Sequence, residues 1–521
     1  MRHLARARPA WRIWRAPAAD AALELRARAP AVDVEVPASS SSARLAIPTR
    51  SGAHQAAGKA HGLHDDMPTA ELRRRVWALS APAIGEQLLA LGVGVSDTFL
   101  SGHLSSYASA RLGYDQATAV AAVGAAGMVT WIVLTGFFAV NVGVTALVAR
   151  ATGARDARLA AKTAGQGALL GMIAGLLMLA LAAPLADLIT IALGVDGQVA
   201  ELTAQFIRVS SLGLPATGIA SACTAAMRGS GDTRRPVLVM LAVNGMNVVA
   251  SWLLLNGAPS LGIQPVGVIG SAIGASTGWV LGAALAITLL ARPHSLAPRL
   301  GRAELKPDLS VARRALRIGL PSAAELAIFQ AGVLTFNHQV VSLGAVPYAA
   351  NVTINTVESL GTLPAFGFSV AATALVGQAL GANSPKLAKR VALAAFWPCL
   401  GLMVALGVLA AAIPQVLLGL FVADPAVLQA GDVAQRLSLL ILPASGATFI
   451  FNGSLRGAGD TKFPVIVRLT GSWALRVPLA ALLIPIFGLA GGRVAMSLDF
   501  LAQSGLAYWR FRSGKWRQSR V

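Results

Sequence analysis

Apolar stretches of about twenty residues, separated by short polar ones, follow one another along most of this 521-residue chain. A helix that crosses the hydrocarbon core of a bilayer needs about 20 apolar residues, so each stretch predicts one membrane-spanning helix. The pattern therefore predicts an all-α polytopic membrane protein with about twelve transmembrane helices. These spans lie near residues 77–102, 118–149, 161–184, 200–227, 236–256, 265–291, 316–340, 347–378, 390–413, 432–455, 464–486 and 488–510.

The composition agrees with this prediction. Hydrophobic residues make up 55% of the chain and charged residues 13%, with a mean hydropathy of +0.64, whereas soluble domains carry about 25% charged residues. The formal net charge of +20 does not indicate nucleic-acid binding, because the cations gather in short clusters between apolar runs without interleaved aromatic residues. Cys223 and Cys399 both lie in apolar segments, which argues against a disulfide or zinc site and predicts packing roles.

Lys and Arg residues cluster before the first predicted span and after every second one. The clusters are Arg73 to Arg75, Arg155 to Lys162, Arg228 to Arg235, Arg292 to Arg317, Lys386 to Arg390, Arg456 to Lys462, and Arg510 to Arg520. The loops near 185–199, 257–264, 341–346, 414–431 and 487 contain neither residue. Because Lys and Arg are enriched in cytoplasmic loops, we expect a multi-pass protein of the cell inner (plasma) membrane with both termini in the cytoplasm.

Residues 1–75 differ from the rest of the chain. They are rich in Arg, Ala, Pro and Ser, with no apolar run long enough for a signal peptide. We expect a disordered cytoplasmic tail, or upstream sequence that is absent from the mature protein, since Met67 stands shortly before the first span. An organelle transit peptide is a third interpretation, which the acidic residues of this segment disfavour.

Two short sequences each occur twice, with the same offset of 228 residues. RGSGDTRRP at 228–236 corresponds to RGAGDTKFP at 456–464, and TALVARATGA at 145–154 corresponds to TALVGQALGA at 373–382. The repeat predicts two copies of a six-span unit, in the same orientation and related by an axis along the membrane normal. The expected domains are a tail (1–75), an N-lobe (76–291), a basic cytoplasmic linker (292–315), a C-lobe (316–510) and a basic cytoplasmic C-terminus (511–521).

These motifs resemble the multidrug and toxic compound extrusion (MATE) family of transporters over nearly all of residues 70–517. The resemblance rests on the paired RGSGDTRRP and RGAGDTKFP, on PAIGEQLLALGVGVSDTFLSGHL, on VESLGTLPAFGFSVAATALVGQALGA and on the closing RFRSGKW. It implies two six-helix lobes that export organic cations or amphipathic drugs in exchange for protons or sodium. It also implies no cofactor beyond the coupling ion, and we expect a functional monomer.

Charged side chains within spans are costly and usually functional. Asp97 lies fifteen residues after Pro82, at the place where the family carries its coupling-ion aspartate, and it is our first candidate. Glu86 stands eleven residues earlier, about three helical turns and roughly 16 Å along the axis, so both acids share one face. A packing role stays open for each, and more so for Glu86.

The eighth span carries a polar stripe at helical spacing. Asn351, Asn355 and Glu358 follow at i, i+4 and i+7 in an otherwise apolar segment. Glu325 in the seventh span mirrors Glu86 by the repeat. Coupling, substrate binding and interhelical packing all remain open for these residues.

The chain departs from the family pattern in the ion site. Asn247 in the fifth span matches a family asparagine, but Ser251 stands where some prokaryotic members carry an aspartate. Phe329 replaces a seventh-span acid of other branches, and the repeat partner of Asp97 is Phe336. These departures argue against a site with several carboxylates and favour protons, while sodium binding at Asp97 remains an alternative.

The duplicated polar motif is expected to be mainly architectural. Its glycines suit a helix C-terminus, its Asp-Thr pair suits the N-cap of the next helix, and its proline suits the first turn. A gating role for these turns stays open. The residues concerned are Arg228, Gly229, Gly231, Asp232, Thr233 and Pro236, and Arg456, Gly457, Gly459, Asp460, Thr461 and Pro464.

Two other functions fit the sequence less well than drug efflux. A flippase for lipid-linked oligosaccharide precursors needs a strongly cationic cavity, whereas the charges expected in mid-span here are mostly acidic. An intramembrane enzyme is disfavoured because the spans contain no HExxH, GxSxG or paired catalytic aspartate motif.

Overall fold

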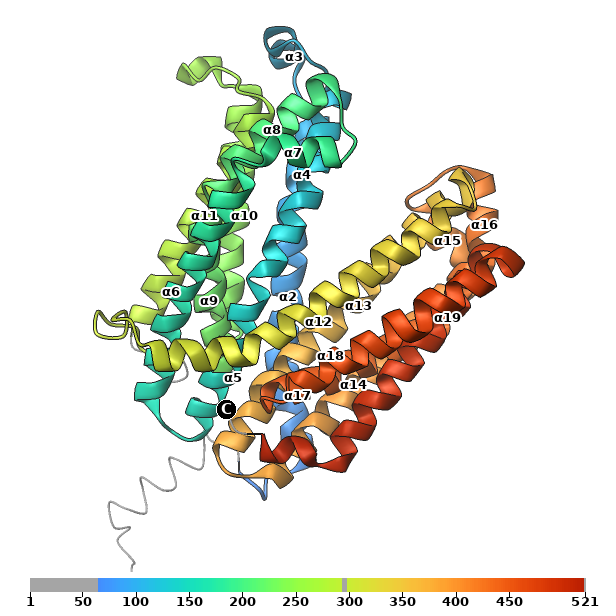
Figure 1. Cartoon of the computed structure of the whole chain (residues 1–521). Helices are drawn as coiled ribbons and strands as arrows, with labels where there is room; N and C mark the ends of the chain where they lie inside the picture. Colours follow the sequence, from blue (N-terminus) through green and yellow to red (C-terminus); the bar gives the residue numbers. More distant parts are fainter. Residues whose placement is uncertain (1–63, 293–297, 520–521) are drawn as a thin grey trace, which may run out of the picture. The chain divides into compact units, whose positions relative to one another are not determined.

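The computed structural model of the chain describes residues 64–292 and 298–519, and Figure 1 shows them as a set of long helices. The helices of the first half are α2 (Thr69–Gly102), α3 (Ser106–Leu112), α4 (Gln116–Gly136), α5 (Phe138–Gly153), α6 (Ala157–Ala182), α7 (Ala186–Ala192), α8 (Gly197–Ser211), α9 (Leu214–Ser230), α10 (Arg234–Asn256), η2 (Pro259–Leu261) and α11 (Val268–Ala291). Those of the second half are α12 (Leu309–Val341), α13 (Ala345–Gly381), α14 (Pro385–Ala412), α15 (Pro414–Gly419), α16 (Pro425–Arg436), α17 (Ser438–Gly457), α18 (Lys462–Arg468), the π-helix η3 (Leu469–Arg476), α19 (Val477–Ser513) and η4 (Lys515–Gln518). The predicted all-α membrane fold is confirmed.

Nine helices of the described residues are long and apolar enough to cross a membrane, or ten if the pair α8 and α9, bent by 53°, forms one span. One of the nine is the run Lys462–Ser513 of 52 residues, about 78 Å long and more than twice the thickness of a bilayer core. Its backbone leaves the helical conformation at Gly488, where φ is 57°, so the run divides into two spans. The shorter apolar helices α4 and α5 are separated by Phe137 alone, and the total of about twelve spans stays a prediction.

The duplicated sequences make equivalent contacts in both halves. The Thr145 hydroxyl of α5 donates to a carbonyl of α9 at 3.1 Å, and the Thr373 hydroxyl of α13 donates to a carbonyl of α17 at 2.9 Å. A Cβ added to Gly229 would lie 2.6 Å from the Thr145 carbonyl oxygen, and Gly457 faces the Thr373 carbonyl in the same way. The first glycine of each motif therefore lets two helices approach at the same place in each half.

The two halves touch through small residues at the ends of α5 and α13. Gly153 packs against the Gln378 carbonyl and Gly381 against the Arg150 carbonyl, so closely that a Cβ on either glycine would collide. Both pairs are related by the offset of 228 residues, so the contact is reciprocal, as expected for elements related by a two-fold axis. Small residues at such positions permit close backbone approach of membrane helices.

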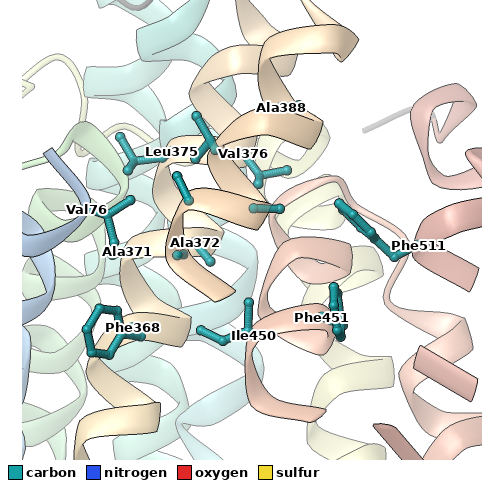
Figure 2. Close-up of a cluster of buried hydrophobic side chains, with 14 of the residues drawn as sticks. Val76, Phe368, Ala371, Ala372, Leu375, Val376, Ala388, Ile450, Phe451 and Phe511 are labelled. Carbon is teal, nitrogen blue, oxygen red and sulfur yellow. The ribbon is translucent and has the colours of Figure 1, made fainter. Parts of the chain in front are cut away.

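The beginning of α2 packs into the apolar core of the second half. Val76 lies in one buried cluster with side chains of α13, α14, α17 and α19, including Phe368 and Leu375 (Figure 2). Cys399 belongs to the same cluster, and Cys223 is buried among α9, α10 and α11 side chains. Both cysteines are free thiols, which agrees with the predicted packing roles.

Two helices begin earlier than the predicted domain limits. The helix α2 starts at Thr69, within the predicted tail, because Leu72 and Val76 already belong to the buried cluster. The helix α12 starts at Leu309, within the predicted linker, where the Asp308 carboxylate accepts hydrogen bonds from the first backbone N–H groups. Most of the predicted tail (1–63) and part of the linker (293–297) lie outside the described residues.

Candidate functional site

Asp97 forms a buried polar site between α2 and α10. Its side chain is 5% exposed, and its Oδ1 accepts hydrogen bonds from Asn247 Nδ2 at 3.0 Å and from Ser251 Oγ at 3.5 Å. The Ser251 hydroxyl also lies 3.4 Å from the Ser271 carbonyl of α11. The structure thus brings Asp97 and Asn247 together, and Ser251, at the position of the missing aspartate, joins them.

Glycines of α11 allow this site to close. Gly274 backs onto Ser251, and a Cβ on Gly278 would lie 2.7 Å from the Val243 carbonyl oxygen of α10. Sequence reasoning missed Ser271, because a backbone carbonyl leaves no trace in the pattern of side chains. The sequence does contain a pattern that indicates close packing of this helix, a small residue at every fourth position: Gly270, Gly274, Gly278 and Gly282.

Glu86, the other buried acid of α2, forms an ion pair. Arg228 Nη1, at the end of α9, donates to Glu86 Oε1, and the two side chains are 15% and 9% exposed. Glu86 and Asp97 are both buried, as their predicted common face requires. Arg228 opens the first copy of the duplicated motif, so its cation serves packing within the protein. A coupling role for Glu86 stays a prediction.

The same ion pair recurs in the second half. Glu325 Oε1 of α12 lies 3.4 Å from Arg456 Nη2, the first residue of the second motif copy, and 3.5 Å from Arg468 Nε. By the repeat, Glu325 corresponds to Glu86 and Arg456 to Arg228. The duplicated arginine therefore neutralises the duplicated glutamate in each half, which the sequence repeat did not reveal by itself.

Arg493 of α19 organises the polar stripe on α13. Its Nη1 donates to Glu358 Oε2 at 2.8 Å, and its Nη2 donates to Asn355 Oδ1 at 3.0 Å and to the Asn351 carbonyl at 3.4 Å. The Ser438 hydroxyl of α17 donates to the other oxygen of Glu358 at 2.6 Å. This geometry favours an interhelical packing role for the stripe.

In the second half of the chain, arginines accompany the buried acids. Arg476 Nε donates to Asp499 Oδ2 at 2.7 Å, and the Arg468 guanidinium lies 4.5 Å from the centroid of Phe329. A carboxylate buried in a span requires a counter-charge, and α17 to α19 supply it. The buried charged residues of the second half, among those described, are Glu325, Glu358, Asp460 and Asp499, with Arg456, Arg468, Arg476 and Arg493.

Asp97 is the exception among the buried carboxylates of the described residues. Six others lie within ion-pair distance of an arginine: Glu86, Asp232, Glu325, Glu358, Asp460 and Asp499. Asp97 is bonded instead to a neutral amide and a neutral hydroxyl. The Asn247 Oδ1 atom beside it is buried and accepts no hydrogen bond from the described residues. A proton or a small cation at this site would therefore meet an uncompensated carboxylate and a vacant acceptor.

The glycines and prolines of the duplicated motif occupy their predicted places. Gly231, with φ of 93°, ends α9, and Gly459, with φ of 82°, follows α17, the left-handed conformation that glycine adopts most easily. Pro236 and Pro464 each stand third in the next helix, α10 and α18. The motif is thus a helix stop followed directly by a helix start.

The aspartates of the two motif copies behave differently. Asp232 Oδ1 accepts hydrogen bonds from the N–H groups of Arg234 and Arg235, each at 3.2 Å, which is the predicted cap. Asp460 instead accepts from Arg510 Nε at 2.7 Å, because the RFRSGKW segment brings a cation to it. Two residues hold N-cap positions without a side-chain capping bond: Thr233 and Thr461.

An open, shallow cavity, lined by residues of α2 alone, lies on another face of this helix. Leu91, Val95 and Phe99 give it apolar walls, and Thr98 supplies a hydroxyl. Thr98 follows Asp97 directly in the chain. A ligand in this cavity and the Asp97 site would therefore be separated only by the α2 backbone.

Comparison with known proteins decides the family. The model of the MatE family matches residues 82–253 and 321–482, well over half of the chain, and the matches begin at Pro82 and Pro321 of the two halves. The chain belongs to the MatE family. It is a MATE transporter of the multidrug efflux type, a multi-pass membrane protein and not an enzyme.

Relatives of this MATE transporter match over most of their length. The probable multidrug resistance protein NorM of Thermotoga maritima is 29% identical over 87% of this chain and 94% of its own. The uncharacterized transporter YisQ of Bacillus subtilis is 24% identical over 85% and 95%. The solved outward-facing multidrug resistance MATE transporter of the MOP superfamily has a TM-score of 0.75 at 19% identity, covering 87% of this chain and 100% of its own. A MATE structure in the bent conformation gives 0.76 at 19% identity, covering 86% and 98%. These structures support the fold.

Proposed function

We propose that this transporter exports organic cations or amphipathic drugs in exchange for protons, by alternating access of its two lobes. The observation that carries the proposal is the environment of Asp97. It is the buried carboxylate without an arginine partner among the described residues, so it can change charge without breaking an ion pair. Burial disfavours the charged form of a carboxyl group, which suits a site that must load and release a proton.

Protonation of Asp97 is the step that releases the drug. The ionised carboxylate holds α2 to α10 by accepting from Asn247 and Ser251. A proton taken from outside turns one oxygen into a donor, which Asn247 Oδ1 can accept because no described group donates to it. The altered bonding of α2 changes the adjacent cavity at Thr98, and a bound cation leaves. The lobes then open to the cytoplasm, the proton departs, and drug binds again.

The number of ions decides which gradient drives export. One proton exchanged for one monovalent cation is electroneutral, so each pH unit supplies about 1.36 kcal/mol, or tenfold accumulation. A second ion per drug adds about 2.3 kcal/mol for each 100 mV of membrane potential.

Sodium is the alternative coupling ion. Oxygen atoms of Asp97, Ser251 and Ser271 approach one another here, and hard cations prefer oxygen ligands. Because Asp97 is the one carboxylate among these oxygen ligands, they supply a single full negative charge. This favours a proton over sodium as the coupling ion.

The reciprocal contact between α5 and α13 supports alternating access. Gly153 and Gly381 hold the two halves together at one end of the helices, where the Lys and Arg clusters lie. We expect this end to face the cytoplasm of the plasma membrane, with both termini on that side and the protein acting as a monomer. In the inward-open state the two glycine contacts separate.

The test is transport by the purified chain in sealed vesicles, with each gradient imposed alone. A pH gradient is expected to drive uptake of a fluorescent cation at constant sodium, and Asp97→Asn is expected to abolish proton-driven uptake. Glu86→Gln tests the other buried acid of α2, which is already paired with Arg228. If Asp97 alone carries the proton, this variant keeps proton coupling. Uptake that follows sodium with pH clamped, or coupling that survives in Asp97→Asn, would overturn the proton mechanism.

The runner-up function, a flippase for lipid-linked oligosaccharide precursors, needs cations that line a cavity. The buried arginines of the second half each lie within ion-pair distance of a carboxylate, and none is more than 8% exposed. A scrambling assay with a lipid-linked oligosaccharide in the same vesicles separates the two functions, since drug efflux predicts no scrambling.

A further inference from the structure

The RFRSGKW motif ends in a compact strap, residues 514–519, that folds back on the end of α19. Gly514, with φ of 72°, ends α19 in the left-handed conformation that glycine adopts most easily, and η4 follows directly. Trp516 of η4 is fully buried. Its ring stacks on Phe511 with 5.3 Å between the ring centroids, and its Nε1 donates to the Phe511 carbonyl at 2.7 Å. The strap is therefore anchored in the second half of the chain.

The other end of the strap contacts the first half. The Ser519 carbonyl oxygen accepts hydrogen bonds from both Nη atoms of Arg150, at 3.1 and 3.2 Å. Arg150 lies in the last turn of α5, and its own carbonyl oxygen lies against Gly381 of α13. The strap thus crosses between the halves at the place where α5 and α13 touch.

The bond between Arg150 and the strap suits a contact that opens and closes. The guanidinium is partly buried and is bonded to a neutral carbonyl, whereas the buried arginines of the second half face carboxylates. Separation of a buried ion pair leaves an unpaired charge on each side. A partly buried guanidinium can instead turn to water and keep its hydrogen bonds, so Arg150 can leave the strap without such a cost.

We propose that the strap holds the two halves together at this end, and that Arg150 must leave the Ser519 carbonyl before this end can open. The proposal rests on the alternating access set out above. Because Trp516 keeps the strap in the second half, any separation of α5 from α13 pulls Arg150 away from it. The strap therefore adds to the glycine contacts and favours the closed arrangement.

A reversible crosslink tests whether the two groups must part. The pair Arg150→Cys/Ser519→Cys is bridged with a short bifunctional thiosulfonate in the full chain, whose two native cysteines are buried. The bridged protein is expected to lose dye uptake in sealed vesicles and to regain it after reduction. The control pair is Arg512→Cys/Lys515→Cys, two exposed positions within the second half, and its bridge should leave uptake unchanged. Uptake by the bridged Arg150 pair equal to its reduced form would overturn the proposal, as would a pair that the reagent cannot bridge.

A second measurement follows the opening itself and does not depend on transport. Spin labels at Arg158→Cys of α6 and Lys389→Cys of α14, both exposed, report the separation of the halves by double electron–electron resonance in nanodiscs. Arg150→Gln should raise the ratio of open to closed molecules about tenfold, which corresponds to about 1.4 kcal/mol and is typical of one hydrogen bond to a charged group. Arg150→Lys, which keeps a donor and the charge, should raise it less.

The matched control is Lys515→Gln, which removes an exposed cation of the strap itself and should stay within about twofold of wild type, as surface substitutions usually do. An equal rise in Arg150→Gln and Lys515→Gln would contradict the assigned contact. A wild type that opens and closes but takes up no dye would count against the proposed function and leave the strap standing.

Discussion

The ion pair of Glu86 and Arg228 recurs as Glu325 and Arg456, with one difference that can be tested. Glu325 has a second cation, Arg468, at 3.5 Å, whereas Arg228 is the only cation paired with Glu86 among the described residues. Removal of one partner of a buried ion pair costs roughly 3–5 kcal/mol, because the remaining charge stays buried without a counter-charge. The two arginines should therefore differ in what their loss does.

We expect Arg228→Gln to lower the free energy of unfolding by about 3 kcal/mol, the low end of that range, because the side chain is 15% exposed. Arg456→Gln should cost about half as much or less, since Arg468 continues to face Glu325. The double variant Glu86→Gln/Arg228→Gln removes both charges, so its loss should be smaller than the sum of the single losses by about 1–3 kcal/mol.

The assay is equilibrium unfolding in mixed micelles with a rising fraction of dodecyl sulfate, followed by circular dichroism. All variants are compared with wild type in the same detergent. Equal losses for Arg228→Gln and Arg456→Gln would refute the role assigned to Arg468. A double variant whose loss equals the sum of the single losses would refute the ion pair itself.

Two further predictions concern packing and pH. Gly229→Ala should lower the free energy of unfolding by about 1–3 kcal/mol, because the new Cβ would lie 2.6 Å from the Thr145 carbonyl oxygen. Gly245→Ala is the control, since a Cβ at Gly245 would have no atom within 4 Å. An equal loss of stability in Gly245→Ala would contradict the packing argument. Hydrogen bonds from Lys162, then Ser310 and the Val311 N–H, hold the pKa of Asp308 below its ordinary 3.8. Ionised Asp308 therefore stabilises the fold above pH 3.8, and this contribution is lost as pH falls through the lowered pKa. Asp308→Asn should lower the melting temperature at pH 7 by more than at pH 3, and an equal difference at both pH values would speak against the pair.

Much of the site could be named from the sequence, and the family resemblance placed Asp97 first, but the sequence could not tell which of the acids are neutralised by a cation. Asp97 and Asn247 were identified from the family resemblance, and they are hydrogen-bonded at 3.0 Å. Glu86 and Glu358 were equally plausible by their position in apolar spans, yet each is neutralised by an arginine. Whether an acid is neutralised depends on which residue lies opposite it. The arginine partner is 142 residues away in the chain for Glu86 and 135 residues away for Glu358.

By itself, the sequence determined the membrane spans, the duplication, the turns of the repeated motif and the family. These features follow from local properties: about twenty apolar residues make a span, and glycine, aspartate and proline at fixed positions end one helix and begin another. Only the tertiary structure decided that Asp97 faces neutral partners while the other buried acids face arginines. That choice depends on how helices rotate and cross when they pack, through close contacts such as those of Gly274 and Gly229. The charge state that each carboxylate can adopt is therefore a property of the packed bundle.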